Sequence, residues 1–237
     1  MNIANHSLDD LKNLFFFGEK VETPYFTFYP PTIKDVLDSG QSEFAKYVTT
    51  LIGKKDKISF SLLLEMTQRN DTLYAEVTKS LEFFLKEKPF YLPDVGLIVL
   101  GNPKDNRVIN ENLFSVLQEY INIYLHLPPK AEIPKDEKPH EKKMREAREK
   151  VEEAKRKKAQ KDDDSLGYSL LDMISSVSLE MSMPPKSLYE CSYYFLTEQF
   201  ERIRRKFNSE LSYQQLLVGA DPKKLDLTNW FYSRAKK

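Results

Sequence analysis

Several kinds of residue are scarce in this chain of 237 residues, and each scarcity narrows what the protein can be. The single cysteine, Cys191, excludes an intramolecular disulfide and any cysteine-rich metal site, so we expect a reducing compartment. No stretch approaches the roughly 20 apolar residues of a membrane-spanning helix. The first residues lack the basic and apolar regions of a secretion signal. We therefore expect a cytosolic protein with no membrane partner.

Sequence patterns that carry common catalytic chemistry are also missing. Neither the phosphate-binding nor the dinucleotide-binding glycine pattern occurs, and His6, His126 and His140 lie far apart without the spacing of metal ligands. Residues 101–104 follow an expected strand, as phosphate-binding loops do, but a hairpin turn accounts for them better. We therefore expect a protein that is not an enzyme and that holds no metal or cofactor.

Neither sign of charge is in excess, because 36 lysines and arginines face 36 aspartates and glutamates. This balance gives no general argument for a nucleic-acid partner. Charged residues concentrate in residues 128–164, which open with prolines and continue almost entirely in Lys, Arg, Glu, Ala and Gln. Such a segment cannot bury enough apolar surface to fold alone, although its local propensity is helical. We interpret it as a solvated, partly helical linker rather than a nucleic-acid-binding arm.

The linker separates an N-terminal part, residues 1–127, from a C-terminal part, residues 165–237. In the N-terminal part, short helical patterns alternate with β-type runs, which predicts an α+β domain. The expected elements are a helix over residues 8–17, a strand over 24–30, a helix capped by Thr32 and Asp35, a helix ended by Gly53, a helix over 71–88, a hairpin over 95–109 and a helix capped by Asn110. The short apolar run over residues 58–66 fits helix or strand equally well.

The C-terminal part is predicted to be helical. Ser165 is expected to cap a helix that ends before the prolines at 184 and 185, and Ser187 to cap a longer amphipathic helix. The apolar stripe of that longer helix is Tyr189, Tyr193, Leu196, Phe200, Ile203, Phe207 and Leu211, spaced by three or four residues. The predicted fold class is thus mostly helical α+β, with a small sheet, a charged linker and a helical C-terminal domain.

A C-terminal part of this size buries only about 60% of its unfolded surface, so apolar side chains are left over. They can dock on the N-terminal part, which we favour, or on another protein. Aromatic residues dominate interface cores. We therefore select five aromatic residues as a mixture of core and partner-binding positions, with most expected in the core. These candidates are Tyr189, Tyr193, Phe200, Phe207 and Trp230.

Two stretches of the sequence carry a recognisable pattern. Residues 28–36 read FYPPTIKDV and precede Gly40 and the FAKY of residues 44–47. Residues 193–202 read YYFLTEQFER, and LLVGA and the pair Asn229-Trp230 follow later in the chain. Together they resemble proteins of tailed phages of Gram-positive bacteria that are similar to tail assembly chaperones. The charged linker is not part of this pattern.

This resemblance implies a non-enzymatic protein of the host cytoplasm. Tail assembly chaperones are thought to hold the tape measure protein while the tail tube polymerises, so the expected partner is the tape measure protein or another tail protein. The alternative is a structural virion component, such as a tail, neck or baseplate subunit. Either reading leaves homo-oligomerisation open.

Overall fold

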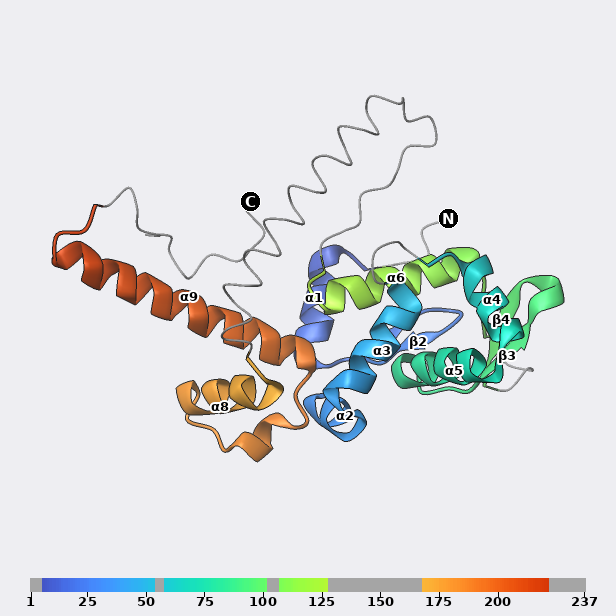
Figure 1. Ribbon diagram of the computed structural model, residues 1–237, viewed down its shortest axis with the longest axis horizontal. Coiled ribbons are helices and arrows are strands. Elements are labelled where there is room, and N and C mark those ends of the chain that lie inside the picture. The colour runs from blue at the N-terminus through green and yellow to red at the C-terminus, as the bar shows by residue number, and fades with distance from the viewer. Residues whose placement is uncertain (1–5, 54–57, 102–106, 128–167, 222–237) are drawn as a thin grey trace, which may run out of the picture.

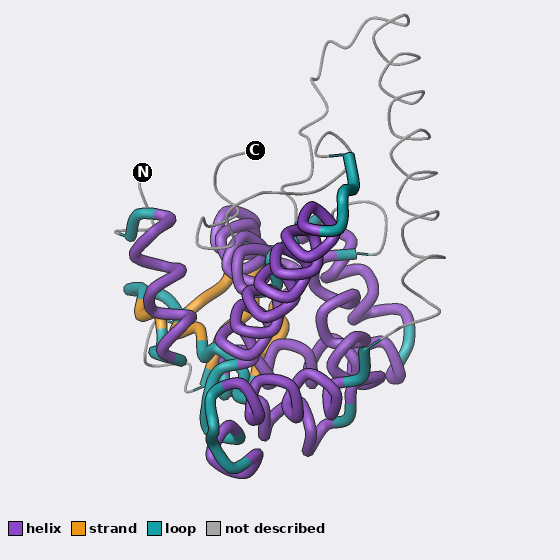
Figure 2. Tube along the Cα trace, turned by 90° about the vertical axis from the view of Figure 1, so that its left-hand side faces the viewer, coloured by secondary structure: helices purple, strands orange, loops and turns teal. Residues whose placement is uncertain are grey.

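The computed structural model describes residues 6–53, 58–101, 107–127 and 168–221 (Figure 1). Helices make up most of this described chain, and the short strands lie among them (Figure 2). The α-helices are α1 (Leu8–Phe17), α2 (Ile33–Ser39), α3 (Gln41–Ile52), α4 (Phe60–Arg69), α5 (Asp71–Leu85), α6 (Glu111–Tyr124), α8 (Leu170–Glu180) and α9 (Tyr193–Leu217). The strands are β1 (Val21–Glu22), β2 (Thr27–Phe28), β3 (Pro89–Leu92), β4 (Leu97–Leu100) and β5 (Val108–Ile109). The predicted fold class, mostly helical α+β, is confirmed.

Side-chain caps decide where several helices begin. The capping box predicted at Thr32 and Asp35 is confirmed: the Asp35 N–H donates to Thr32 Oγ1 at 3.0 Å and the Thr32 N–H donates to Asp35 Oδ2 at 2.8 Å. Asn110 caps α6 by a single bond, in which its Oδ1 accepts the N–H of Leu113 at 3.0 Å. Such caps satisfy N–H groups that have no partner inside the helix, so local sequence is enough to place them.

Two small antiparallel sheets complete the N-terminal part. The predicted hairpin is confirmed by β4 and β5, in which Ile98 faces Ile109. Strand β3 was not predicted, because Pro89 was expected only to end the preceding helix. It opens a strand here because β3 lies at the edge of the order β3-β4-β5, where a missing N–H is tolerated. Pro93–Val95 forms a 3₁₀ turn between β3 and β4.

For two other segments of the N-terminal part, the structure corrects or decides the predicted secondary structure. The strand expected over residues 24–30 is reduced to the two residues of β2, since the N–H of Tyr29 donates to the carbonyl of Phe84 in α5 instead of to a strand. Most of the ambiguous run over residues 58–66 is helical: it belongs to α4, which begins at Phe60 and packs on α5 and α6.

The long C-terminal helix begins later than predicted. Residues Pro185–Leu188 form a 3₁₀ turn, and α9 starts at Tyr193 with Ser192 rather than Ser187 as its cap. The residues between them cannot join the helix because their carbonyl groups bind the N-terminal part: those of Tyr189 and Cys191 accept hydrogen bonds from α2. Helix α8 is capped by Ser169. The cap expected at Ser165 lies outside the described residues.

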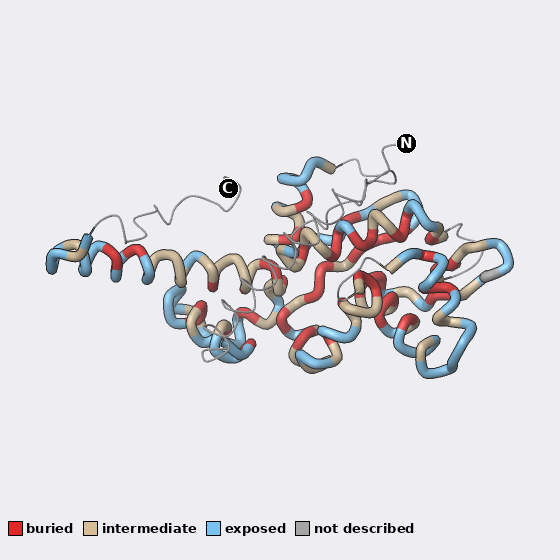
Figure 3. The backbone as a smooth tube through the Cα atoms, turned by 45° about the horizontal axis from the view of Figure 1, so that its top comes forward, coloured by how far each residue is buried: buried red, intermediate tan, exposed pale blue. Residues whose placement is uncertain are grey.

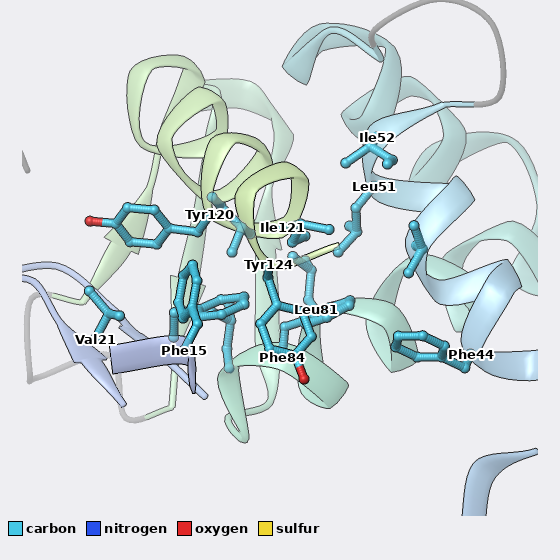
Figure 4. Packing of buried hydrophobic residues seen from close by; sticks show 14 of the residues in the cluster. Phe15, Val21, Phe44, Leu51, Ile52, Leu81, Phe84, Tyr120, Ile121 and Tyr124 are labelled. Carbon is cyan, nitrogen blue, oxygen red and sulfur yellow. The ribbon is translucent and has the colours of Figure 1, made fainter. Parts of the chain in front are cut away.

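One buried apolar cluster joins the N-terminal part to α8 and α9. Figure 4 shows Ile121 and Tyr124 of α6 close to Phe15, Leu81 and Phe84 within this cluster. The C-terminal part contributes Leu170, Ile174, Val177, Leu188, Tyr194, Leu196 and Phe200 to the same cluster. The C-terminal helices therefore dock on the N-terminal part. The linker lies outside the described residues, so the division at 127 and 165 stays a prediction.

Candidate protein-interaction surface

The two stretches that carry the resemblance meet in space, at the start of α2 and of α9. The N–H of Tyr193 donates to the carbonyl of Pro31 at 3.0 Å. The N–H groups of Ile33 and Lys34 donate to the carbonyls of Cys191 and Tyr189 at 2.9 and 3.0 Å. Each helix start thus supplies acceptors for the otherwise unpaired N–H groups of the other. We call this arrangement the α2–α9 junction.

The hydroxyl of Tyr124 lies at the centre of the α2–α9 junction. It donates to the carbonyl of Pro31 at 2.5 Å and accepts the N–H of Tyr194 at 3.3 Å. Burial of this fully enclosed side chain raises the pKa of Tyr124 well above its ordinary value, so the phenol stays protonated and can donate. This role was not predicted from the sequence. The spacing of aromatic residues indicates which of them are buried, but it does not show which buried tyrosine forms hydrogen bonds through its hydroxyl.

Ser192 and Glu198 tie α9 further to the N-terminal part. Ser192 Oγ donates to the carbonyl of Phe15 at 2.6 Å and accepts the N–H of Phe195 at 3.0 Å. Glu198 is half-buried beside His126, which follows the end of α6: its Oε1 lies 3.4 Å from His126 Nδ1 and its Oε2 lies 4.0 Å from Arg202 Nε.

Asp35 makes the junction sensitive to acid. Burial alone would raise the pKa of Asp35, but hydrogen bonds from Thr32 and the charge of Lys86, with Nζ 3.2 Å from Oδ1, outweigh it and lower the pKa. Ionised Asp35 therefore stabilises the fold above the pKa of an unfolded aspartate, about 3.9, and this contribution is lost as the pH falls through the lower pKa of the folded state.

We expect Asp35→Asn to lower the free energy of unfolding at neutral pH by about 1 kcal/mol, since it weakens a cap and an ion pair. The variant should also lose less stability than the unmodified protein on acidification below about pH 4. Urea unfolding at a series of pH values measures both effects. Asp38→Asn, on the exposed side of the same helix, is the control. Parallel pH profiles for the two variants would contradict this account.

The five candidate residues do not form one site. Phe200 is buried, with its ring centroid 4.9 Å from that of Tyr168. Tyr193 is half-buried against Phe44, at 5.4 Å between centroids. Tyr189 is half-buried before the start of α9, Phe207 is 65% exposed, and Trp230 lies outside the described residues. Their role in binding a partner stays a prediction.

Apolar residues continue along α9 beyond the part that α8 covers. Phe207, Leu211 and Val218 follow buried Phe200 on the same helical face, yet they are 65%, 43% and 86% exposed. Figure 1 shows this half of α9 extending past α8, and Figure 3 shows exposed positions along it and at its far end. We call Phe207, Leu211 and Val218 the α9 stripe. Exposed apolar surface of this kind often marks an interaction site.

The described residues were also searched for metal ligands, membrane-spanning helices and a reactive thiol. Among those residues, no group of three or more His, Cys, Asp or Glu could hold a metal ion. No described helix has the length and apolar character needed to cross a membrane. Cys191 is half-buried. Burial, and to a smaller extent the negative charge of Glu190, raise the pKa of the Cys191 thiol, which disfavours the reactive thiolate.

Comparison with known proteins relates the C-terminal third of the chain to phages. Residues 156–233 match the model of a family described as YomV second domain, and this range contains α8, α9 and the α9 stripe. No curated protein and no solved structure matches the chain. YomV is a Bacillus phage or prophage protein. In this region, the chain is therefore similar to a domain of a phage-associated protein.

Proposed function

We propose that the protein is a non-enzymatic tail assembly chaperone that binds the tape measure protein of a phage during tail assembly. The observation that supports this proposal best is the α9 stripe, an exposed apolar face within the region that matches a phage-associated domain. The sequence resemblance described above points to the same class of protein. A long helical client suits such a surface, because amphipathic helices bind through apolar residues at helical spacing.

Hydrogen bonds to the N-terminal part fix the position of the helix that carries this surface. The start of α9 is held by Ser192, Tyr194 and the rest of the α2–α9 junction. Lys206 of α9 pairs with Glu180 at the end of α8, with Nζ 2.5 Å from Oε1. The second half of α9 extends past α8 (Figure 1). A client helix placed on the α9 stripe would contact Phe207 and Leu211 at the centre and charged groups at the rim, as in most protein interfaces.

Co-purification tests the proposal. The tagged protein is expressed together with the tape measure protein of the same phage, and a stable complex is expected. Changing Phe207 and Leu211 together to alanine should weaken binding by about 30-fold or more, the effect of losing an aromatic contact worth about 2 kcal/mol. The fold should survive because both side chains are exposed. Phe200 is unsuitable for this test because it is buried.

Leu179→Ala is the matched control, since Leu179 is an apolar residue of α8 that is 83% exposed and lies outside the α9 stripe. It should leave binding unchanged. If the correctly folded protein forms no complex, or if the double variant binds as well as the control, the chaperone proposal fails.

A structural virion component is the second candidate. The shared buried cluster holds α9 and the N-terminal part in one arrangement, which suits a subunit that packs in fixed positions in a particle. Mass spectrometry of purified virions separates the two functions. A chaperone should be absent from the particle, whereas a tail, neck or baseplate subunit should be present at a fixed copy number.

A further inference from the structure

The second half of α9 presents apolar residues to water at the spacing that suits another helix. From Tyr193 to Phe207, apolar residues recur every three or four positions, as they do in helices that pack side by side along their length. The first part of this face is used within the chain, since Leu196 and Phe200 lie in the buried cluster. At Phe207 and Leu211 the same face is 65% and 43% exposed. The open part of the face therefore fits a helix as its occupant.

Two opposite charges flank the α9 stripe on one side. Lys206 and Glu210 each stand one position before a residue of the stripe, so they lie on the same side of it. If Leu211 of an antiparallel second copy packs on Phe207, then Glu210 of that copy lies beside Lys206, and the reverse contact forms by symmetry. Lysine has three donor hydrogens, so Lys206 can keep its pair with Glu180. In shape and charge, this surface is complementary to itself.

A second copy can reach this surface without obstruction from the described chain. Figure 1 shows the second half of α9 extending past α8 and away from the N-terminal helices. In Figure 3, exposed positions follow this half of the helix to its end. Antiparallel pairing places the two N-terminal parts at opposite ends of the pair, so they stay clear of each other.

We propose that two copies of the free protein pair through their α9 helices, which run antiparallel with Phe207 of each copy against Leu211 of the other. The pairing removes the centre of the α9 stripe from water, and two ion pairs between Lys206 and Glu210 flank it. A client then competes with the second copy for one surface, a consequence that rests on the proposed function. The dimer itself concerns the free protein and needs no client.

Sedimentation velocity of the full-length protein over a range of concentrations tests the proposal. Residues 207–217 span only about 15 Å of helix, and a contact of this length buries less than the roughly 800 Å² per partner of a standard interface. We therefore expect a reversible dimer with a Kd of roughly 10–100 μM. Changing Phe207 and Leu211 together to glutamine should raise the Kd at least about tenfold. Phe17→Gln, at a 74% exposed apolar position of α1, is the control and should leave the Kd unchanged.

Exchanging charges tests the antiparallel register. Glu210→Lys places a lysine opposite Lys206 of the second copy, and Lys206→Glu places a glutamate opposite Glu210 of the second copy. Each variant alone should therefore dimerise about tenfold more weakly. An equimolar mixture of the two variants should recover the dimer, because every lysine then faces a glutamate. High salt should weaken the recovered dimer, since the flanking pairs are exposed to solvent.

Three results would overturn the proposal. The first is a protein that stays monomeric up to about 1 mM, and the second is a dimer that the double glutamine variant forms equally well. The third is a mixture of the two charge variants that is no more dimeric than either variant alone. Since no client is present, failure here is distinguishable from failure of co-purification: a monomer that still binds the tape measure protein contradicts only the dimer.

Discussion

Replacing Phe15 by alanine is expected to lower the free energy of unfolding by about 3–5 kcal/mol, the cost of removing a fully buried phenylalanine. The Phe15 ring is completely buried, and its centroid lies 5.5 Å from those of Phe28 and Tyr124, both in edge-to-face geometry. It also lies 6.2 Å from Tyr194. Such aromatic pairs add about 0.5–1.5 kcal/mol beyond the burial of apolar area.

The position of Phe15 explains why the effect should be global. Its partners come from β2, α6 and α9, so the ring connects α1 to both parts of the chain. A cavity at this point removes contacts on several elements at once, and the surrounding helices cannot close it without moving the α2–α9 junction. A loss of this size is a large fraction of the roughly 5–15 kcal/mol that stabilises a typical domain.

Urea unfolding followed by circular dichroism measures this effect. Phe15→Leu keeps the site apolar and should lose only about 1–2 kcal/mol, so it remains measurable if the alanine variant does not fold. Phe17→Ala is the control on the same helix: Phe17 is 74% exposed, and the change should stay within about 0.5 kcal/mol. Equal unfolding midpoints for Phe15→Ala and Phe17→Ala would show that the aromatic cluster does not hold the two parts together.

Tyr124→Phe is expected to lower the free energy of unfolding by about 1–3 kcal/mol, although it removes a single oxygen atom. Without the hydroxyl, two buried hydrogen bonds are lost, one from the N–H of Tyr194 and one to the carbonyl of Pro31, which also accepts the N–H of Tyr193. Losing hydrogen bonds of buried polar groups costs free energy because no water replaces the lost partner. The ring itself, and its contact with Phe15, stay in place.

Tyr120→Phe provides the matched control from the same helix, α6. The Tyr120 hydroxyl is buried and has no hydrogen-bond partner among the described residues, so its removal should be neutral or stabilising. Thermal and urea unfolding of the two variants should therefore move in different directions or by clearly different amounts. If both variants shift the midpoint equally, the hydroxyl of Tyr124 does not support the junction.

Features that depend on a few neighbouring residues could be predicted from the sequence. The capping box of Thr32 and Asp35, the cap at Asn110 and the end of α1 at Gly18 all follow from short-range hydrogen bonds and backbone preferences. The β4–β5 hairpin and the mostly helical fold class belong to the same group. These features were accessible because the interacting groups lie close together along the chain.

For the candidate surface, the sequence could predict which residues share a face of α9 but not which of them are buried and which are exposed. Periodicity placed Phe200 and Phe207 on one stripe of one helix, which the structure confirms. It could not show that Phe200 is buried while Phe207 is exposed, since that difference depends on which stretch of α9 is covered by another helix. The spacing of apolar residues identifies one face of a helix, but it does not show how much of that face another helix covers.

Tertiary structure alone decided the features that bring distant segments together. The start of α9 moved from the predicted Ser187 to Ser192 because the carbonyls of Tyr189 and Cys191 are taken by α2. Strand β3 formed at Pro89 because a sheet edge was available there. The sequence by itself determined the helical faces, the caps and the hairpin, through interactions within a few residues. Pairing between segments some 160 residues apart depends on the packing of the whole core, which no local pattern contains.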